Sequence, residues 1–129
     1  KTVYLYDTTL RDGTQSQEIS LSVLDKVAVA EKLDEFGIHY IEGGYPGSNP
    51  KDKEFFDLAR KIRWKNSVLC AFGMTRRVGE KGDDEANKEA LVAAGTPGIT
   101  VVGKVWDFHV TAAPFASLEN TAAMSASLC

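Results

Sequence analysis

Residues 20–47, SLSVLDKVAVAEKLDEFGIHYIEGGYPG, contain the pattern that decides the fold. In the first part, apolar residues recur largely at three- and four-residue steps, which predicts an amphipathic helix over 20–36 that ends at Gly37. Residues 38–42 then read as a short strand, which runs into a glycine-containing turn at 43–47. This stretch therefore predicts an α-helix followed directly by a β-strand.

The same alternation continues on both sides of this stretch. The other predicted elements are strands at 3–6, 67–73 and 98–103, a helix that begins near Pro50, and a helix over 84–94 that ends at Gly95. Regular alternation of strands and helices predicts parallel strands joined by right-handed crossovers. The fold class is therefore α/β, either a doubly wound sheet or a section of a barrel, and periodicity alone does not choose between them.

Composition excludes several classes of function. Of the 129 residues, 43% are hydrophobic and 26% are charged, which is typical of a globular domain. The net charge is −3, with 15 basic and 18 acidic residues mixed along the chain, so we expect no binding to nucleic acid or to an anionic membrane. No apolar run approaches the roughly 20 residues of a membrane-spanning helix, and the start does not resemble a signal peptide. We therefore expect a cytoplasmic protein, in which Cys70 and Cys129 are reduced thiols.

Three charged residues follow two of the predicted strands. Arg11 and Asp12 lie just beyond the first strand, and Glu42 ends the second. Because the carboxyl ends of parallel strands share one rim, these side chains are expected to converge there. Asp12 could bind a hard divalent cation, and Arg11 could neutralise an oxyanion beside it, which suggests enolate stabilisation. The alternative is a polar turn at 11–13 and a loop cap at Glu42.

Longer matches favour the functional interpretation. Residues 7–15, DTTLRDGTQ, resemble the signature that opens the catalytic domain of the family comprising 2-isopropylmalate synthase, homocitrate synthase, citramalate synthase and 3-hydroxy-3-methylglutaryl-CoA lyase. Residues 40–46, YIEGGYP, resemble the second-strand motif of that family. The resemblance implies a TIM (β/α)₈ barrel, of which this chain would be about the first four β/α units.

The resemblance also implies roles for individual residues. Arg11 would stabilise enolate and alkoxide charge and, with Glu42, would be catalytic, while Asp12 would bind a divalent metal ion, Mg or Mn, with Zn possible. Gln15 and Glu42 would shape the substrate pocket beside Arg11. Acetyl-CoA would be the co-substrate.

A third segment points to one branch of the family. Residues 103–111, GKVWDFHVT, resemble the fourth-strand segment of citramalate synthases, which places His109 near the carboxylate of the oxo acid and makes Thr111 a further substrate-binding residue. The alternative for His109 is structural packing among its aromatic neighbours. His39, near the start of the second strand, is expected to be structural. The paired arginines at 76–77 could meet the CoA phosphates or form a solvated loop.

The implied parent enzyme condenses acetyl-CoA with pyruvate to give (R)-citramalate, a step of isoleucine biosynthesis, and is a homodimer. The alternatives are 2-isopropylmalate synthesis, carbon–carbon cleavage by a lyase of the same superfamily, and a non-catalytic remnant that at most binds a partner.

The length of the chain conflicts with a complete barrel, which needs about 250 residues. We therefore expect residues 1–129 to be the N-terminal part of a barrel domain, with the resemblance covering 2–111 and an atypical, charge-poor tail at 112–129. The family's metal site uses a His-x-His pair, whereas the chain has only His39 and His109. The chain alone is expected to be inactive and, with two open sheet edges, to self-associate if it folds.

Overall fold

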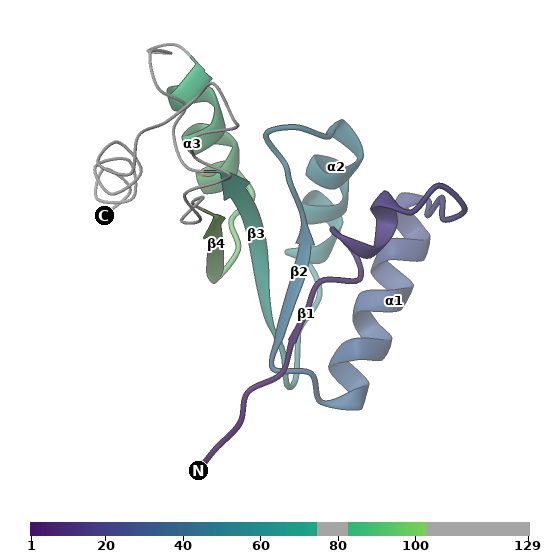
Figure 1. The fold of residues 1–129 in the computed structure, drawn as a ribbon. Helices are drawn as coiled ribbons and strands as arrows, with labels where there is room; N and C mark the ends of the chain where they lie inside the picture. The colour runs from purple at the N-terminus through teal and green to yellow at the C-terminus, as the bar shows by residue number, and fades with distance from the viewer. Residues whose placement is uncertain (75–82, 103–129) are drawn as a thin grey trace, which may run out of the picture.

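The computed structural model describes residues 1–74 and 83–102, in which strands and helices alternate along the chain (Figure 1). In chain order the elements are β1 (Tyr6–Asp7), the 3₁₀ helix η1 (Gly13–Gln15), α1 (Val23–Phe36), β2 (Tyr40–Gly44), α2 (Pro50–Ala59), β3 (Val68–Met74), α3 (Asp83–Ala93) and β4 (Gly98–Val102). The predicted β-α alternation is therefore confirmed.

The four described strands form one parallel sheet in the order β1-β2-β3-β4. A doubly wound sheet reverses its strand order at a switch point, whereas each new strand of a barrel is added beside the last. The sheet is also curved, because the hydroxyl of Tyr6 on β1 is hydrogen-bonded to that of Thr100 on β4, two strands beyond its neighbour. Sequential order and curvature both favour a section of a barrel.

The sheet has two faces of different character. On the face toward the helices, Ile41, Leu69 and Ala71 are buried with Phe55 and Phe56 of α2 in the hydrophobic core. Figure 1 shows α1 and α2 side by side along the flank of β1 and β2. Because side chains alternate along a strand, the neighbours of these core residues point to the concave face. That face carries polar groups, among them the side chains of Tyr6, Glu42 and Thr100.

Helix α1 begins later than predicted because Ser22 is its N-cap. The Ser22 hydroxyl accepts from the Asp25 N–H at 3.1 Å, and the Asp25 carboxylate accepts from the Ser22 N–H at 2.8 Å, which together form a capping box. Gly37 ends the helix in the left-handed conformation, with φ 89°, as the sequence predicted.

The polar and apolar faces of α1 differ from the sequence pattern. Lys26 and Asp34 fall between the regularly spaced apolar residues yet are buried, whereas the apolar Leu24 and Phe36 are 71% and 81% exposed. Lys26 is buried because it forms an ion pair with Asp52 of α2. Periodicity cannot detect such a pair, because its two partners come from different helices.

Two further boundaries differ from the prediction. The first strand covers only Tyr6–Asp7, and the residues before it remain exposed. Gly43 and Gly44, expected to begin a turn, belong to β2, where the pairing with β3 shifts register between Glu42 and Gly44. This bulge lies directly after Glu42, at the carboxyl end of the strand.

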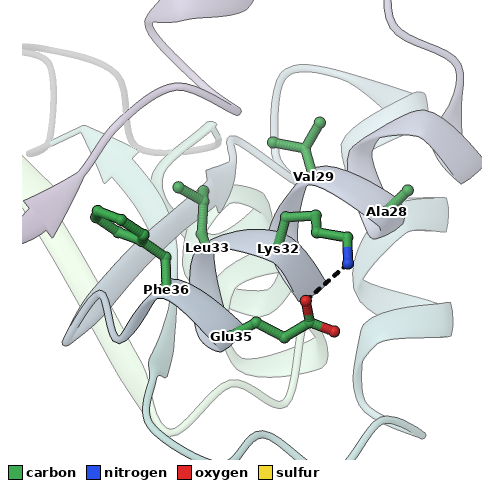
Figure 2. Close-up of a pocket in the computed structure, with 6 residues that line it drawn as sticks. All are labelled: Ala28, Val29, Lys32, Leu33, Glu35 and Phe36. Carbon is green, nitrogen blue, oxygen red and sulfur yellow. Dashed lines mark hydrogen bonds and ion pairs between the residues drawn. The ribbon is translucent and has the colours of Figure 1, made fainter.

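A shallow hollow lies on the outer surface of α1, between the apolar side chains of Val29, Leu33 and Phe36 and the Lys32–Glu35 ion pair (Figure 2). It is formed by the end of the helix that leads into the start of β2, so it lies opposite the carboxyl edge of the sheet.

Among residues 1–74 and 83–102, no helix combines the length and apolar character needed to cross a membrane.

Candidate functional site

The loop after β1 is a tight turn that fixes the position of Arg11. The carbonyl of Thr8 accepts from the N–H groups of Arg11 at 3.1 Å, Asp12 at 2.8 Å and Gly13 at 3.2 Å. The Asp7 carboxylate accepts from the N–H of Thr9 at 2.9 Å, which is an Asx turn. These bonds place Arg11 and Asp12 at the carboxyl end of β1.

Arg11 forms an ion pair with Glu42 of the neighbouring strand. The Nε–H of Arg11 donates to Oε1 of Glu42, a residue that is 1% exposed. The guanidinium carbon lies 4.3 Å from the centre of the Phe72 ring, and Nη1 donates to the Asp12 carboxylate at 3.1 Å. The guanidinium is therefore held at two nitrogens and on one face. The predicted convergence of Arg11, Asp12 and Glu42 is present in the structure.

Tyr6 completes the surroundings of Glu42. Its hydroxyl donates to Oε2 of Glu42 at 2.5 Å and is also hydrogen-bonded to the Thr100 hydroxyl. Burial of the phenol, with the hydrogen bond to Glu42, raises the pKa of Tyr6 well above its ordinary value. The phenol therefore remains a neutral hydrogen-bond donor at physiological pH.

Cys70 lies beside Glu42 on β3 and is not activated as a nucleophile. The two residues are register partners, and Cys70 is a free, buried cysteine. Burial raises the pKa of the Cys70 thiol, so it stays protonated near neutral pH. The other cysteine, Cys129, lies outside the described residues.

The loop after β2 is tied to the two helices beneath it. The N–H of Tyr45 donates to Asp52 Oδ2 at 2.8 Å, while Oδ1 of the same carboxylate pairs with Lys26. The Tyr45 ring packs edge-on against Phe72, 5.4 Å between centroids, and Phe72 carries the Arg11 guanidinium on its ring. A buried ion pair in the helix layer thus supports the side chain against which Arg11 packs.

The guanidinium of Arg11 can still bind an anion. In the described part of the chain, no protein acceptor is bonded to Nη2 of Arg11, and its side chain is 20% exposed. Asp12 is also accessible, with a side chain that is 59% exposed. A partly exposed guanidinium with one unoccupied donor group next to an accessible carboxylate can bind an oxyanion and a cation side by side.

The described residues do not form a complete metal centre. No group of three His, Cys, Asp or Glu side chains lies close enough to hold a metal ion among residues 1–74 and 83–102. Of the two carboxylates beside Arg11, Asp12 is accessible, whereas Glu42 is engaged by Arg11 and Tyr6. One carboxylate is too few ligands for a divalent ion, so an ion held by Asp12 would need further ligands from outside the described residues.

The remaining predicted residues are placed as follows. Gln15 ends η1 with an exposed side chain, and its backbone N–H donates to the carbonyl of Asp12 at 3.0 Å. His109 and Thr111 lie outside the described residues, as do the arginines at 76–77. The Nδ1 atom of His39 accepts from the Leu5 N–H at 3.0 Å, at the amino end of β2, which agrees with a structural role.

Sequence reasoning did not identify Tyr6, Phe72 and Thr100 as members of the site. Each was assigned to a strand, and strand residues of these types are usually packing residues. Once strand order and register are known, the two-residue alternation along the strands places all three on the same concave face as Glu42.

Comparison with known proteins shows the family to which this chain is similar. Residues 2–128 match the HMGL-like family. The (R)-citramalate synthase of Aquifex aeolicus is 54% identical over 118 residues, and that of Streptomyces coelicolor is 47% identical over 124 residues, which cover 92% and 95% of this chain. The 2-isopropylmalate synthase of Bacillus licheniformis is 32% identical over 84% of the chain. The chain spans only 20% to 23% of the length of these relatives.

A solved structure fits the same interpretation of the fold. The hydroxymethylglutaryl-CoA lyase of Pseudomonas aeruginosa, a TIM barrel, superposes with a TM-score of 0.73 at 21% identity and covers 99% of this chain and 41% of the lyase chain. The predicted fold class, a partial TIM barrel, is confirmed. The family match, which extends over nearly the whole sequence, also confirms the resemblance seen in residues 7–15 and 40–46. The chain belongs to the HMGL-like family.

Proposed function

We propose that this chain is the first part of the catalytic barrel of an acyltransferase that condenses acetyl-CoA with pyruvate to give (R)-citramalate and CoA. The support is twofold. The relatives with the higher identities, 41% to 54%, carry the name (R)-citramalate synthase, whereas the 2-isopropylmalate synthases are 32% to 38% identical. The concave face also carries a guanidinium that is suited to an enolate oxygen.

The single observation that carries the proposal is the way Arg11 is held. Its Nε is bonded to a buried carboxylate and its face lies on Phe72, while Nη2 has no partner among the described residues. Condensation at the methyl carbon of acetyl-CoA requires an enolate, whose negative charge lies on the thioester oxygen. A preorganised donor aimed at that charge lowers the barrier without reorganising during the reaction.

We assign roles to the residues on the support of these contacts and of the resemblance. Arg11 binds the developing oxyanion, first on the enolate and then on the alkoxide formed when the new carbon–carbon bond closes. Glu42 orients Arg11 and offsets part of its charge, and Asp12 lies within reach of a cation that would hold the oxo acid. A divalent ion, Mg or Mn, would polarise the oxo-acid carbonyl when bound. Gln15, His109 and Thr111 are proposed to contact the oxo acid.

The proposal extends to the wider context of the enzyme. We place it in the cytoplasm as a homodimer, with acetyl-CoA and a 2-oxo acid as its partners and isoleucine biosynthesis as its pathway. The part of the barrel beyond this chain would provide the remaining metal ligands and the acid–base groups. Residues 1–129 alone are therefore proposed to be inactive.

The test is release of free CoA thiol from acetyl-CoA, with magnesium or manganese and a panel of 2-oxo acids. The complete enzyme and residues 1–129 are assayed in parallel. We expect the complete enzyme to prefer pyruvate and the 129-residue chain to be silent. Preference for 2-oxoisovalerate would indicate a 2-isopropylmalate synthase, and cleavage of a 3-hydroxyacyl-CoA without condensation would indicate a lyase. Activity of the 129-residue chain would contradict the proposed incomplete site.

A further inference from the structure

A tyrosine outside the signature motif has an unusual set of contacts. Tyr6 comes from β1, yet its hydroxyl reaches Glu42 on β2 and Thr100 on β4 across the concave face. Glu42 is thereby held at both oxygens, with Arg11 on Oε1 and Tyr6 on Oε2. Neither oxygen is free to rotate toward another donor, which fixes the plane of the carboxylate.

The ring of Tyr6 is itself fixed. It stacks on Tyr40, its register partner on β2, with 6.1 Å between ring centroids and 26° between ring planes. The strand therefore sets the ring position, and the hydroxyl is delivered to Glu42 without dependence on a flexible loop. A phenol that stays neutral at physiological pH can donate to the carboxylate throughout the working range of a cytoplasmic enzyme.

We infer that Tyr6 is a positioning residue for the reaction. Its hydroxyl fixes the Glu42 carboxylate from the concave side, and Glu42 in turn holds Arg11 against Phe72. The Nη2 donor of Arg11 is then directed at the reacting oxyanion. This inference rests on the proposed function and deepens it. Tyr6 does not touch the substrate in this assignment, because its hydroxyl is occupied by Glu42 and Thr100. Its effect on the reaction passes through Glu42 alone.

The variant that isolates this role is Tyr6→Phe in the complete enzyme. It keeps the ring that stacks on Tyr40 and removes only the hydroxyl. Loss of orientation at a catalytic group costs about 10- to 100-fold in rate, so kcat is expected to fall by that factor. KM for the oxo acid should change little, because the Arg11 charge remains in the pocket.

A double-mutant cycle separates positioning from general structural support. If Tyr6 acts through Glu42, then Tyr6→Phe should cost less than about twofold in kcat when introduced into a Glu42→Gln enzyme. If Tyr6 instead contributed structural support independent of Glu42, Tyr6→Phe would lower kcat by the same factor in the Glu42→Gln enzyme as in wild type. Thr100, the other partner of the Tyr6 hydroxyl, gives a second check. Thr100→Ser keeps the side-chain hydroxyl and should retain more activity than Thr100→Val, which removes it.

Tyr4→Phe is the matched control. Tyr4 lies two residues earlier, is 63% exposed, and contacts His39 and Tyr40 through its ring. We expect it to leave kcat within about twofold of wild type, as for a surface substitution away from the site.

The outcomes for Tyr6 and for the proposed function are distinct. Suppose that the wild type is active. The role of Tyr6 would be overturned if Tyr6→Phe left kcat unchanged, or if the effects of Tyr6→Phe and Glu42→Gln on kcat multiplied independently, and the proposed function would still stand. A wild type that is silent with every 2-oxo acid and acetyl-CoA would overturn the proposed function and the role of Tyr6 with it.

Discussion

The Nε–H of Arg11 donates to Oε1 of Glu42, and this bond joins the loop after β1 to the end of β2. Its position follows from the parallel register, in which Asp7 lies opposite Ile41 and the next residue of β2 is Glu42. The loop needs only the tight turn at Thr8 to bring Arg11 back over that carboxylate. Two strands and one turn therefore assemble the charged centre of the site.

Replacement of Glu42 by Gln tests what the buried carboxylate contributes. The variant keeps the size of the side chain and removes the charge that faces Arg11. We expect kcat to fall about 10- to 100-fold, because a neutral amide holds the guanidinium less firmly and its NH2 group cannot accept from Tyr6 as Oε2 does. Steady-state kinetics of CoA release measure this effect. Glu54→Gln, at an exposed position on α2, is the matched control, and an equal kcat for the two variants would rule out a catalytic contribution from Glu42.

Asp12→Asn tests the proposed metal ligand without relying on activity. The amide is a weaker ligand than a carboxylate for Mg or Mn, and the partly exposed position of Asp12 should allow the substitution without a change in fold. We expect the Kd of the divalent ion to rise at least about tenfold, as found when metal sites lose a contributing group. Calorimetric titration of the complete enzyme gives this value, and an unchanged Kd would remove Asp12 from the ligand set.

Asp34 predicts a specific dependence of stability on pH. Burial alone would raise the pKa of this carboxyl, but hydrogen bonds from the backbone N–H groups of Lys65, Asn66 and Ser67 lower it below its ordinary value. The resulting stability is fully present above the unfolded-state pKa, about 3.9 for Asp, and is lost as the pH falls through the lower folded-state pKa.

The measurement compares wild type with Asp34→Asn in the complete enzyme. At neutral pH the variant should be less stable by about 2–3 kcal/mol, because it leaves buried N–H donors poorly paired. The gap between the two unfolding free energies should narrow as the pH falls below about 4. A gap that stays constant from pH 7 to about 3 would show that the ionised Asp34 carboxylate is not the stabilising species.

Gly43→Ala should disrupt the packing beneath the site. A Cβ at Gly43 would lie 2.5 Å from Phe55 Cε1 and 2.9 Å from Phe56 Cε1, two buried aromatic rings of α2. We expect a loss of about 1–3 kcal/mol in the free energy of unfolding. Gly13→Ala is the control, since its Cβ would meet Thr9 at an ordinary 3.6 Å. Chemical denaturation that finds equal losses for the two variants would contradict the close packing at Gly43.

Much of the fold could be predicted from the sequence because the decisive signals are local. The capping residues and Gly37 mark the ends of α1, and Gly95, with φ 62°, marks the end of α3. Leu24 and Phe36 are exposed although they fit the apolar spacing of the helix, because three- and four-residue spacing alone does not identify the neighbours of a helix. The buried Lys26–Asp52 pair depends on the packing of α1 on α2 and has no local signature.

The candidate site could be predicted in part for the same reason. Arg11, Asp12 and Glu42 stand at strand ends, where the parallel arrangement alone brings them together. Tyr6 and Thr100 lie 94 positions apart, and their contact depends on the curvature of the sheet. Strand periodicity assigns each to a face, but only the three-dimensional order of the strands places them beside the same carboxylate.

The central claim is that Arg11 stabilises the enolate formed from acetyl-CoA, and the direct test is the rate of CoA release with pyruvate in wild type, Arg11→Gln and Arg11→Lys. Removal of a preorganised oxyanion donor costs about 10²- to 10³-fold in kcat, and we expect both variants to lose at least that much. Lysine should not rescue the activity, because an ammonium cannot pair with Glu42 and present a second donor in the same plane. A kcat within about threefold of wild type for Arg11→Gln would contradict the claim.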